Sequence, residues 1–258
     1  MPSHAGVDFV NVKHHDTYPA IDPAKADLKG KVVVTGASKG IGKAIALAFA
    51  QAGVSGLVLL ARSDMNAVKA VCEAAQRPGQ SLRALIVHCD ITNIEHVSAA
   101  SNIVKDTFGR LDILVNNAGV YTISNRGTYH VTREFLPLLI ECGGDKTIIN
   151  LNSVAAHLLQ PRFSAYESSK PVLLRFTELV MAEYSENGIL AYSVHPGAIA
   201  SDMSVTMPDM KHLILDTPEI ASHTTVWLAR CHLWDMDELL AKKKQIVDGD
   251  KLKVRMVV

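Results

Sequence analysis

The stretch Thr35-Gly36-Ala37-Ser38-Lys39-Gly40-Ile41-Gly42 follows a short β-branched run, Lys31 to Thr35, and precedes an apolar helical period that begins at Ile41. Between a strand and a helix, glycines permit a tight turn and a close approach of the backbone to a phosphate, and the first helical turn offers unpaired N–H groups. An ordinary connection between a strand and a helix is the alternative. The flanking strand and helix favour a dinucleotide-binding turn.

Outward from this turn, short β-branched runs alternate with longer amphipathic runs. The predicted strands are residues 31–35, 57–60, 82–89, 111–115, 147–151 and 190–194. The predicted helices are 41–52, 65–76, a helix from a Thr92–Glu95 capping box to Phe108, and 166–184. This order predicts an α/β fold of Rossmann type, a doubly wound parallel sheet with helices on both faces.

The chain of 258 residues is 48% hydrophobic, which is enough to bury one core. We expect an extension over residues 1–29, a Rossmann-fold domain over 30–230, and a tail over 231–258 that packs on the domain or on a partner subunit. The four cysteines show neither a CxxC motif nor an ordered ligand spacing, so we expect no metal site and no disulfide.

Charge and hydropathy restrict the partners. Lys plus Arg and Asp plus Glu number 26 each, so no net field attracts nucleic acid or an acidic membrane surface. No segment offers roughly 18 uncharged apolar residues in a row, and the first residues do not resemble a signal peptide. We therefore expect a cytoplasmic protein whose partners are a small-molecule substrate and copies of itself, as a homodimer or homotetramer.

The end of the second predicted strand indicates which dinucleotide binds. A carboxylate at this point would accept hydrogen bonds from a ribose 2′-hydroxyl, but the strand ends Leu60-Ala61-Arg62. Arg62, joined by Lys39 of the glycine turn, can pair with a 2′-phosphate, which predicts NADP(H). The alternative is that both cations are solvated surface charges.

Tyr166 and Lys170 lie four residues apart on a predicted helix, hence on one face. A neighbouring ammonium favours the phenolate of a tyrosine, which would then exchange a proton with a substrate oxygen. Ser153 follows the fifth predicted strand, at the sheet edge where open α/β sheets bind ligands. A lone tyrosine–lysine pair would more simply be a surface contact, so the prediction depends on all three residues.

Together these motifs resemble those of the classical short-chain dehydrogenase/reductase family, from Lys31 to Leu228. The glycine turn is similar to the family's TGxxxGxG, Asn116 to Gly119 read as its NNAG motif, and Pro196-Gly197 through Ser201 is similar to its PG motif. On the charge argument and this resemblance, the residues expected to bind the cofactor are Gly36, Ser38, Lys39, Gly40, Ile41, Gly42, Arg62, Asp90, Asn117, Tyr166, Lys170, Pro196, Gly197, Ile199 and Ser201.

The resemblance also implies the chemistry. Ser153 would hydrogen-bond the reacting oxygen, Tyr166 would transfer the proton, and Lys170 would hold the nicotinamide ribose, while a hydride moves between cofactor and substrate. Asn125 best matches the family's fourth catalytic residue. The implied function is NADP(H)-dependent interconversion of a carbonyl and an alcohol. The alternatives are a cofactor-binding scaffold or regulator with little redox activity, and a non-redox isomerase or cyclase.

Two departures from the family pattern are visible. The chain has fewer residues than the family between Tyr121 and Asn125, where a helix is expected to be missing or reduced, and again between Arg230 and Trp234, near the last parallel strand. Residues 251–258 alternate apolar and basic residues and would replace that edge strand or pair across a subunit boundary. The tail otherwise resembles that of fungal specialised-metabolism reductases.

The substrate is expected to be small and largely apolar, although core packing explains most apolar residues equally well. Two further features are predicted: a kink after Lys170 at Pro171, and a His195 that ends a strand without binding metal. The apolar residues that flank the predicted site are Val120, Tyr121, Ala155, Leu158, Leu159, Met203 and Met207, and the polar ones are His157 and Arg162.

Overall fold

The computed structural model describes residues 14–119, 125–141, 143–159, 161–201 and 214–229. Their strands form one parallel sheet in the order β3-β2-β1-β4-β5-β6. The strands are β1 (Lys31–Thr35), β2 (Gly56–Ala61), β3 (Arg83–His88), β4 (Ile113–Asn116), β5 (Thr147–Leu151) and β6 (Leu190–Val194). The strand order reverses between β1 and β4, and this is the point at which open α/β sheets form a ligand crevice.

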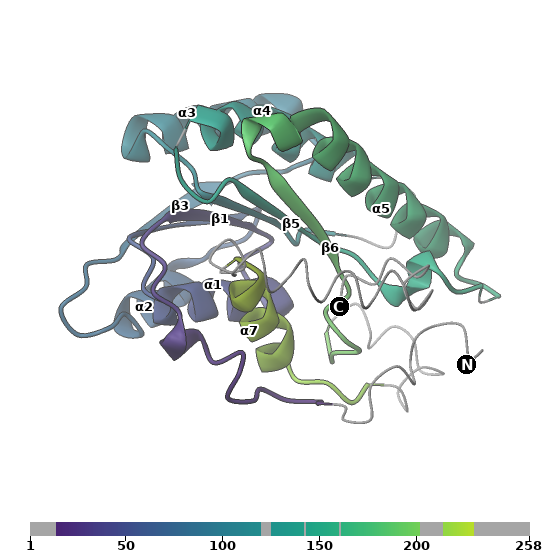
Figure 1. The fold of residues 1–258 in the computed structure, drawn as a ribbon, viewed down its shortest axis with the longest axis horizontal. Coiled ribbons are helices and arrows are strands. Elements are labelled where there is room, and N and C mark those ends of the chain that lie inside the picture. Colours follow the sequence, from purple (N-terminus) through teal and green to yellow (C-terminus); the bar gives the residue numbers. More distant parts are fainter. Residues whose placement is uncertain (1–13, 120–124, 142, 160, 202–213, 230–258) are drawn as a thin grey trace.

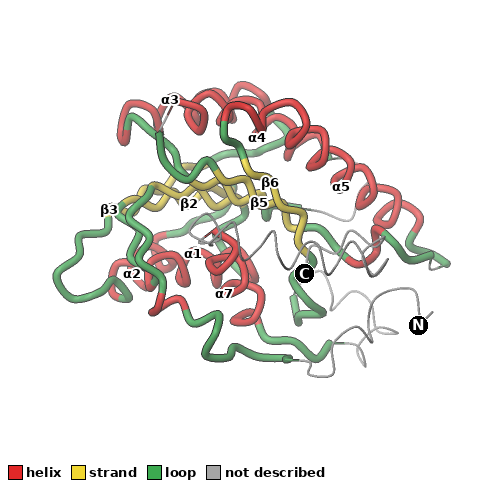
Figure 2. The backbone as a smooth tube through the Cα atoms, viewed as in Figure 1, coloured by secondary structure: helices red, strands yellow, loops and turns green. Residues whose placement is uncertain are grey.

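Helices cover both faces of the sheet, which lies between them as a single layer (Figures 1 and 2). One face carries α1 (Gly40–Gln51), α2 (Asn66–Ala74) and α7 (Pro218–Ala229). The other carries α3 (Ile94–Phe108), α4 (Arg126–Glu141) and α5 (Ser164–Tyr184). The predicted doubly wound fold is therefore confirmed.

The two faces contain separate hydrophobic cores. Phe49 of α1 is fully buried in one core, and Phe135 of α4 in the other. Strands β2 and β4 are buried along their whole length because helices cover them on both sides. This explains why their sequences read as continuous apolar runs rather than as alternating ones.

The start of α3 differs from the prediction. Asn93, not Thr92, is the N-cap, and its Oδ1 accepts a hydrogen bond of 3.0 Å from His96 N. Thr92 instead donates from both its backbone N–H and its hydroxyl to Asp90 Oδ1. The predicted capping box is wrong because Thr92 hydrogen-bonds to Asp90 in a tight turn after β3 and does not cap the helix. Gly109 ends the helix with φ 68°, as expected.

Helices α4 and α7 were not among the predicted elements. In α4 the buried residues Val131, Phe135, Leu138 and Leu139 follow the helical spacing, which would have identified it. Pro137 lies inside this helix, where a proline is ordinarily disfavoured. Helix α5 also contains a proline, Pro171, at the position where a kink was predicted. The helix continues through Pro171 without interruption.

Residues 14–29 run along the face that carries α1 and α7 and include a short 3-10 helix, Pro23–Lys25. Ile21, Ala26 and Leu28 are buried there. The Arg77 side chain donates hydrogen bonds to the backbone carbonyls of Pro23, Ala24, Ala26 and Gln51. This stretch therefore packs on the domain.

Several predictions fall outside the described residues: those for Val120, Tyr121, Met203 and Met207, for the tail 231–258 and its segment 251–258, and for two of the cysteines. Cys72 and Cys89 are buried free thiols. No helix in the described part of the chain is long and apolar enough to cross a membrane.

Candidate active site

The glycine turn opens at the carboxyl end of β1. Gly36 has φ 68°, and its N–H donates to Leu60 O at 2.7 Å, so the turn folds against the end of β2. A Cβ on Gly42 would lie 2.3 Å from Gly36 O, a distance that only glycine allows. At Gly40, by contrast, a Cβ would meet no atom within 4 Å, and Lys39 does not cap α1 with its side chain. The turn and the first turn of α1 therefore form an open cradle that fits a pyrophosphate.

A hydrogen-bonded junction holds this turn to the next strand. Asn117 and Ala118 both donate their backbone N–H to Thr35 Oγ1 at 3.0 Å. The Asn117 side chain donates to Thr35 O at 2.9 Å. Thr35, which sequence reasoning did not single out, thus joins β1 to β4 at the point where the strand order reverses. Its position as the last residue of an apolar strand was the available signal.

The residues assigned to the adenosine end lie after β2 and β3. Arg62 is exposed directly after β2, and Lys39 is exposed in the glycine turn. Two hydrogen bonds from Thr92 lower the pKa of the Asp90 carboxyl, and the charge of Arg62 lowers it further. The end of β2 therefore carries an exposed cation close to an ionised carboxylate.

Ser153, Tyr166 and Lys170 come together at the carboxyl end of β5. The Ser153 side chain hydrogen-bonds to that of Tyr166, and Ser153 Oγ also accepts from Ala155 N at 3.1 Å. Lys170 Nζ lies 5.0 Å from the centroid of the Tyr166 ring. The two helical side chains thus point to the same side of α5, and the loop after β5 adds the serine hydroxyl.

Burial dominates the electrostatics of this group. It lowers the pKa of the Lys170 ammonium to about 8. It also raises the pKa of the Tyr166 phenol, against a smaller lowering by the hydrogen bond with Ser153. The net shift of the Tyr166 pKa is therefore opposite to the expected lowering, because burial penalises the phenolate more than the hydrogen bond with Ser153 stabilises it.

Asparagine side chains anchor α5, the helix that carries Tyr166 and Lys170. Asn152 Nδ2 donates to Lys170 O at 3.2 Å and to Ser193 Oγ at 2.8 Å. Asn125 Nδ2 donates to Ser169 O at 2.6 Å, so this residue, which precedes α4, lies against α5 beside Lys170. Sequence reasoning selected Asn125 but missed Asn152, which lies next to Ser153 in the chain.

The loop after β6 contains Pro196, Gly197, Ile199 and Ser201, which were assigned to the cofactor. Gly197 has φ 100°, a conformation that favours glycine, and Ile199 is buried and forms a parallel bridge with Asp216. Asp216 Oδ2 accepts a hydrogen bond of 2.6 Å from Ala198 N. Asp216 was missed because nothing near it in the sequence marks it as a partner of this loop.

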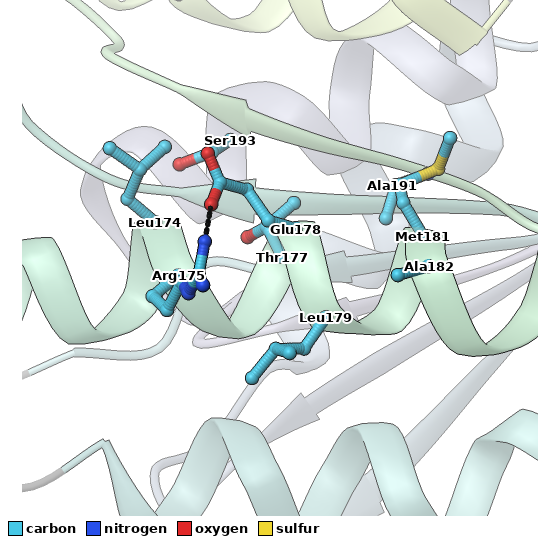
Figure 3. A pocket seen from close by; sticks show the side chains of 9 residues that line it. All are labelled: Leu174, Arg175, Thr177, Glu178, Leu179, Met181, Ala182, Ala191 and Ser193. Carbon is cyan, nitrogen blue, oxygen red and sulfur yellow. Dashed lines mark hydrogen bonds and ion pairs between the residues drawn. The ribbon is translucent and has the colours of Figure 1, made fainter.

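Two hollows lie near α5. One, of about 450 Å³, lies between α5 and β6 on the outer flank and is lined by residues such as Leu179, Met181 and Ser193 (Figure 3). The other, of about 680 Å³, is lined by residues from 156 to 171, His157, Leu158 and Leu159 among them. Neither includes Ser153, Tyr166 or Lys170 in its lining. Among the described residues, no His, Cys, Asp and Glu side chains form a group of three or more that could hold a metal ion.

Comparison with known proteins places these features in a family. Residues 30–212 match the family model described as short chain dehydrogenase. The short chain dehydrogenase mpl6 of Monascus purpureus is 41% identical over 291 aligned positions, which cover 100% of this chain and 99% of the relative. The short chain dehydrogenase pigC of Monascus ruber is 42% identical, over 97% of this chain and 94% of the relative. The first alignment is longer than the chain, so that relative carries residues that this chain lacks.

Solved structures show the same fold. A short-chain type dehydrogenase/reductase from Mycobacterium marinum superposes with a TM-score of 0.72 at 23% identity, over 84% of this chain and 94% of the other. L-sorbose reductase from Gluconobacter frateurii, complexed with NADPH and L-sorbose, gives 0.66 at 24% identity over 81% and 91%. A 7α-hydroxysteroid dehydrogenase complexed with NADH gives 0.68 at 24% identity over 83% and 91%.

Proposed function

The chain belongs to the short-chain dehydrogenase family, and from this premise we propose that it is an NADP(H)-dependent oxidoreductase that interconverts a carbonyl and an alcohol on a small, largely apolar substrate. One observation carries the proposal. Tyr166, Lys170 and Ser153 meet beside an open glycine turn, and a protein that only bound a dinucleotide would have no chemical use for that group of side chains.

The cofactor would lie across the carboxyl ends of the strands. The glycine turn and the first turn of α1 would hold its pyrophosphate, Arg62 and Lys39 its 2′-phosphate, and the loop that contains Gly197 and Ile199 its nicotinamide end. When bound, the nicotinamide supplies or accepts the hydride. The support on this chain is the cradle at Gly40 and Gly42, which has room for a phosphate and would lose its shape with a larger residue at position 42.

Proton transfer is assigned to Tyr166. Its raised pKa keeps the phenol protonated near neutral pH, and this is the form that can donate a proton to a carbonyl oxygen as that oxygen gains charge. Ser153 Oγ, hydrogen-bonded to Tyr166, would hold the same substrate oxygen. The Lys170 ammonium over the ring would stabilise the phenolate that remains.

Replacement of Tyr166 tests this assignment. Tyr166→Phe keeps the ring and removes the hydroxyl, so we expect turnover to fall by at least about 10³-fold, while the Kd for NADPH stays within about threefold. Turnover is measured as the change in reduced-nicotinamide absorbance with a panel of ketones. Turnover by Tyr166→Phe at the wild-type rate would remove Tyr166 from this role.

The choice of NADP(H) is tested separately by calorimetric titration with NADPH and NADH. We expect NADPH to bind more tightly and Arg62→Ala to weaken NADPH by about tenfold while leaving NADH within about twofold, because only NADPH carries the 2′-phosphate. Arg133→Ala, on the opposite face of the sheet, is the matched control and should change neither. Tighter binding of NADH by the wild-type protein would refute the choice.

A second candidate is a cofactor-binding scaffold with little redox activity. The observation that favours it is that this chain is shortened relative to its Monascus purpureus relative. Binding of NADPH without turnover across the ketone panel would support it over the oxidoreductase. The remaining proposals are the 30–230 domain boundaries, a cytoplasmic location, and a homodimer or homotetramer. Limited proteolysis, cell fractionation and light scattering respectively test these three.

A further inference from the structure

The first described residues lie against the segment that begins α7. Thr217 N donates to His15 O at 2.9 Å, and Thr217 Oγ1 donates to Asp16 Oδ1 at 2.7 Å. Thr17 Oγ1 and His223 Nδ1 are 2.5 Å apart and hydrogen-bonded. Backbone and side chains both take part, so residues 15–17, here called the N-terminal strap, are held against α7 by several independent bonds.

Asp216 connects the strap to the loop after β6. Its Oδ2 accepts from Ala198 N at 2.6 Å, and its Oδ1 is 2.7 Å from His15 Nδ1. The two carboxylate oxygens thus face two different segments, one of them in the loop 196–201. A rotation of the carboxylate that broke one bond would also disturb the other.

The loop itself depends closely on this carboxylate. A Cβ on Gly197 would lie 2.7 Å from Asp216 Oδ2, so the loop and the carboxylate meet without space between them. Leu215 N and Asp216 N both donate to Ala198 O at 3.2 Å, and Ile199 pairs with Asp216 in a parallel bridge. The orientation of the Ala198 and Ile199 peptides therefore follows the position of Asp216.

We propose that His15 is a positioning residue for the cofactor: through Asp216 it sets the conformation of the loop 196–201, and with it the affinity for NADP(H). This rests on the proposed function, in which that loop holds the nicotinamide end. His15 lies in the N-terminal extension that precedes β1, so a residue of this extension would contribute to the dinucleotide site. His15 touches neither cofactor nor substrate in this proposal and acts only through Asp216.

Three variants test it. His15→Ala removes the bond to Asp216, His15→Asn restores a donor near the position of Nδ1, and His14→Ala is the matched control, because His14 stacks on Tyr18 with ring centroids 4.0 Å apart and lies one residue away. Calorimetric titration with NADPH should show the Kd raised by about tenfold in His15→Ala, restored to within about threefold in His15→Asn, and unchanged in His14→Ala. KM for NADPH should rise with kcat nearly constant.

Hydrogen exchange of the protein alone provides the readout that does not depend on the cofactor. In His15→Ala, amides of the peptide 195–201 should exchange at least about fivefold faster, while those of α4 keep the wild-type rate. Unchanged exchange at 195–201 overturns the proposal, and so does faster exchange with an unchanged Kd. If the wild-type chain binds neither NADPH nor NADH, the proposed function and the cofactor role of His15 both fail, and the exchange rates still decide whether His15 positions the loop.

Discussion

At the scale of single residues, Lys170 is held where its charge is disfavoured. Burial lowers the pKa of its ammonium to about 8 from the ordinary 10.5. The unfolded chain therefore binds this proton more tightly than the folded chain does. The cost to stability is fully present below pH 8 and diminishes as the pH rises from 8 to 10.5. A residue kept at such a cost fits a role in chemistry better than one in folding.

Replacing Lys170 should therefore stabilise the protein. We expect Lys170→Met to raise the free energy of unfolding at pH 7 by on the order of 1–3 kcal/mol, and this gain should shrink towards zero at pH 10. Urea unfolding at the two pH values measures it. Lys69→Met, at a partly exposed position of α2 where the lysine pairs with Glu73, should stay within about 0.5 kcal/mol at both. A gain that persists unchanged at pH 10 would contradict the assigned cause.

Gly42 is the residue on which the shape of the phosphate cradle depends most. A Cβ there would lie 2.3 Å from Gly36 O and 2.4 Å from the Asn117 side-chain nitrogen. Gly42→Ala should thus raise the Kd for NADPH by at least about tenfold and cost about 1–3 kcal/mol of unfolding free energy. Calorimetry and urea unfolding measure the two effects. Gly119→Ala, whose Cβ would meet no atom closer than 3.8 Å, should leave the unfolding free energy unchanged.

At the scale of elements, buried amides join the strands to α5. Asn116 Nδ2 of β4 donates to Asn150 Oδ1 of β5 at 2.9 Å, and Asn150 Nδ2 donates to Thr177 Oγ1 of α5 at 2.8 Å. These groups are fully or nearly fully buried, so a polar atom that loses one of these hydrogen bonds cannot replace it with a bond to solvent. The network fixes the distance between β5, which leads to Ser153, and α5, which carries Tyr166.

Removing the central amide should loosen that junction. We expect Asn150→Ala to lower the free energy of unfolding by about 2–4 kcal/mol, because it removes one of the two acceptors of Asn116 Nδ2, removes the donor to Thr177 Oγ1 and opens a small cavity. Asn102→Ala, at an exposed position of α3, is the same substitution without burial and should cost less than about 0.5 kcal/mol. Chemical denaturation compares the two. Equal losses would show that the network contributes little.

At the scale of the whole molecule, residues 14–29 connect distant parts of the fold. The strap reaches the loop after β6 through Asp216, and further along, the carbonyls of Pro23, Ala24 and Ala26 accept hydrogen bonds from Arg77, beyond the end of α2. A guanidinium suits this purpose because its fixed array of donors can satisfy several carbonyls at once. This stretch is therefore packed against the domain at both of these places.

Arg77→Ala should release this stretch from the domain. We expect the free energy of unfolding to fall by about 1–3 kcal/mol and cleavage after Lys25 and Lys29 by endoproteinase Lys-C to become at least about fivefold faster. Arg175→Ala, which removes an exposed ion pair with Glu178 on α5, should change neither by a measurable amount. Wild-type cleavage rates in Arg77→Ala would show that other contacts hold the stretch.

The sequence alone determined those features of the protein that depend on local patterns of residues. The short runs at 31–35, 147–151 and 190–194 predicted strands with the observed bounds, and the spacing of Tyr166 and Lys170 predicted that both side chains point to one side of a helix. Helical and strand periods, turn residues and i,i+4 spacings depend on neighbours in the chain, so they can be read without the fold.

Only the tertiary structure decided the rest, because burial and partners far apart in the chain leave no local pattern. Thr92 hydrogen-bonds to Asp90 and does not cap the helix as predicted. Burial raises the pKa of Tyr166, whereas the sequence predicted a lowering. His15 and Asp216 lie 201 positions apart, and Asn152 and Ser193 lie 41 apart. Such pairs form only once folding has brought distant segments together, so the fold, and not the spacing of residues along the chain, selected them.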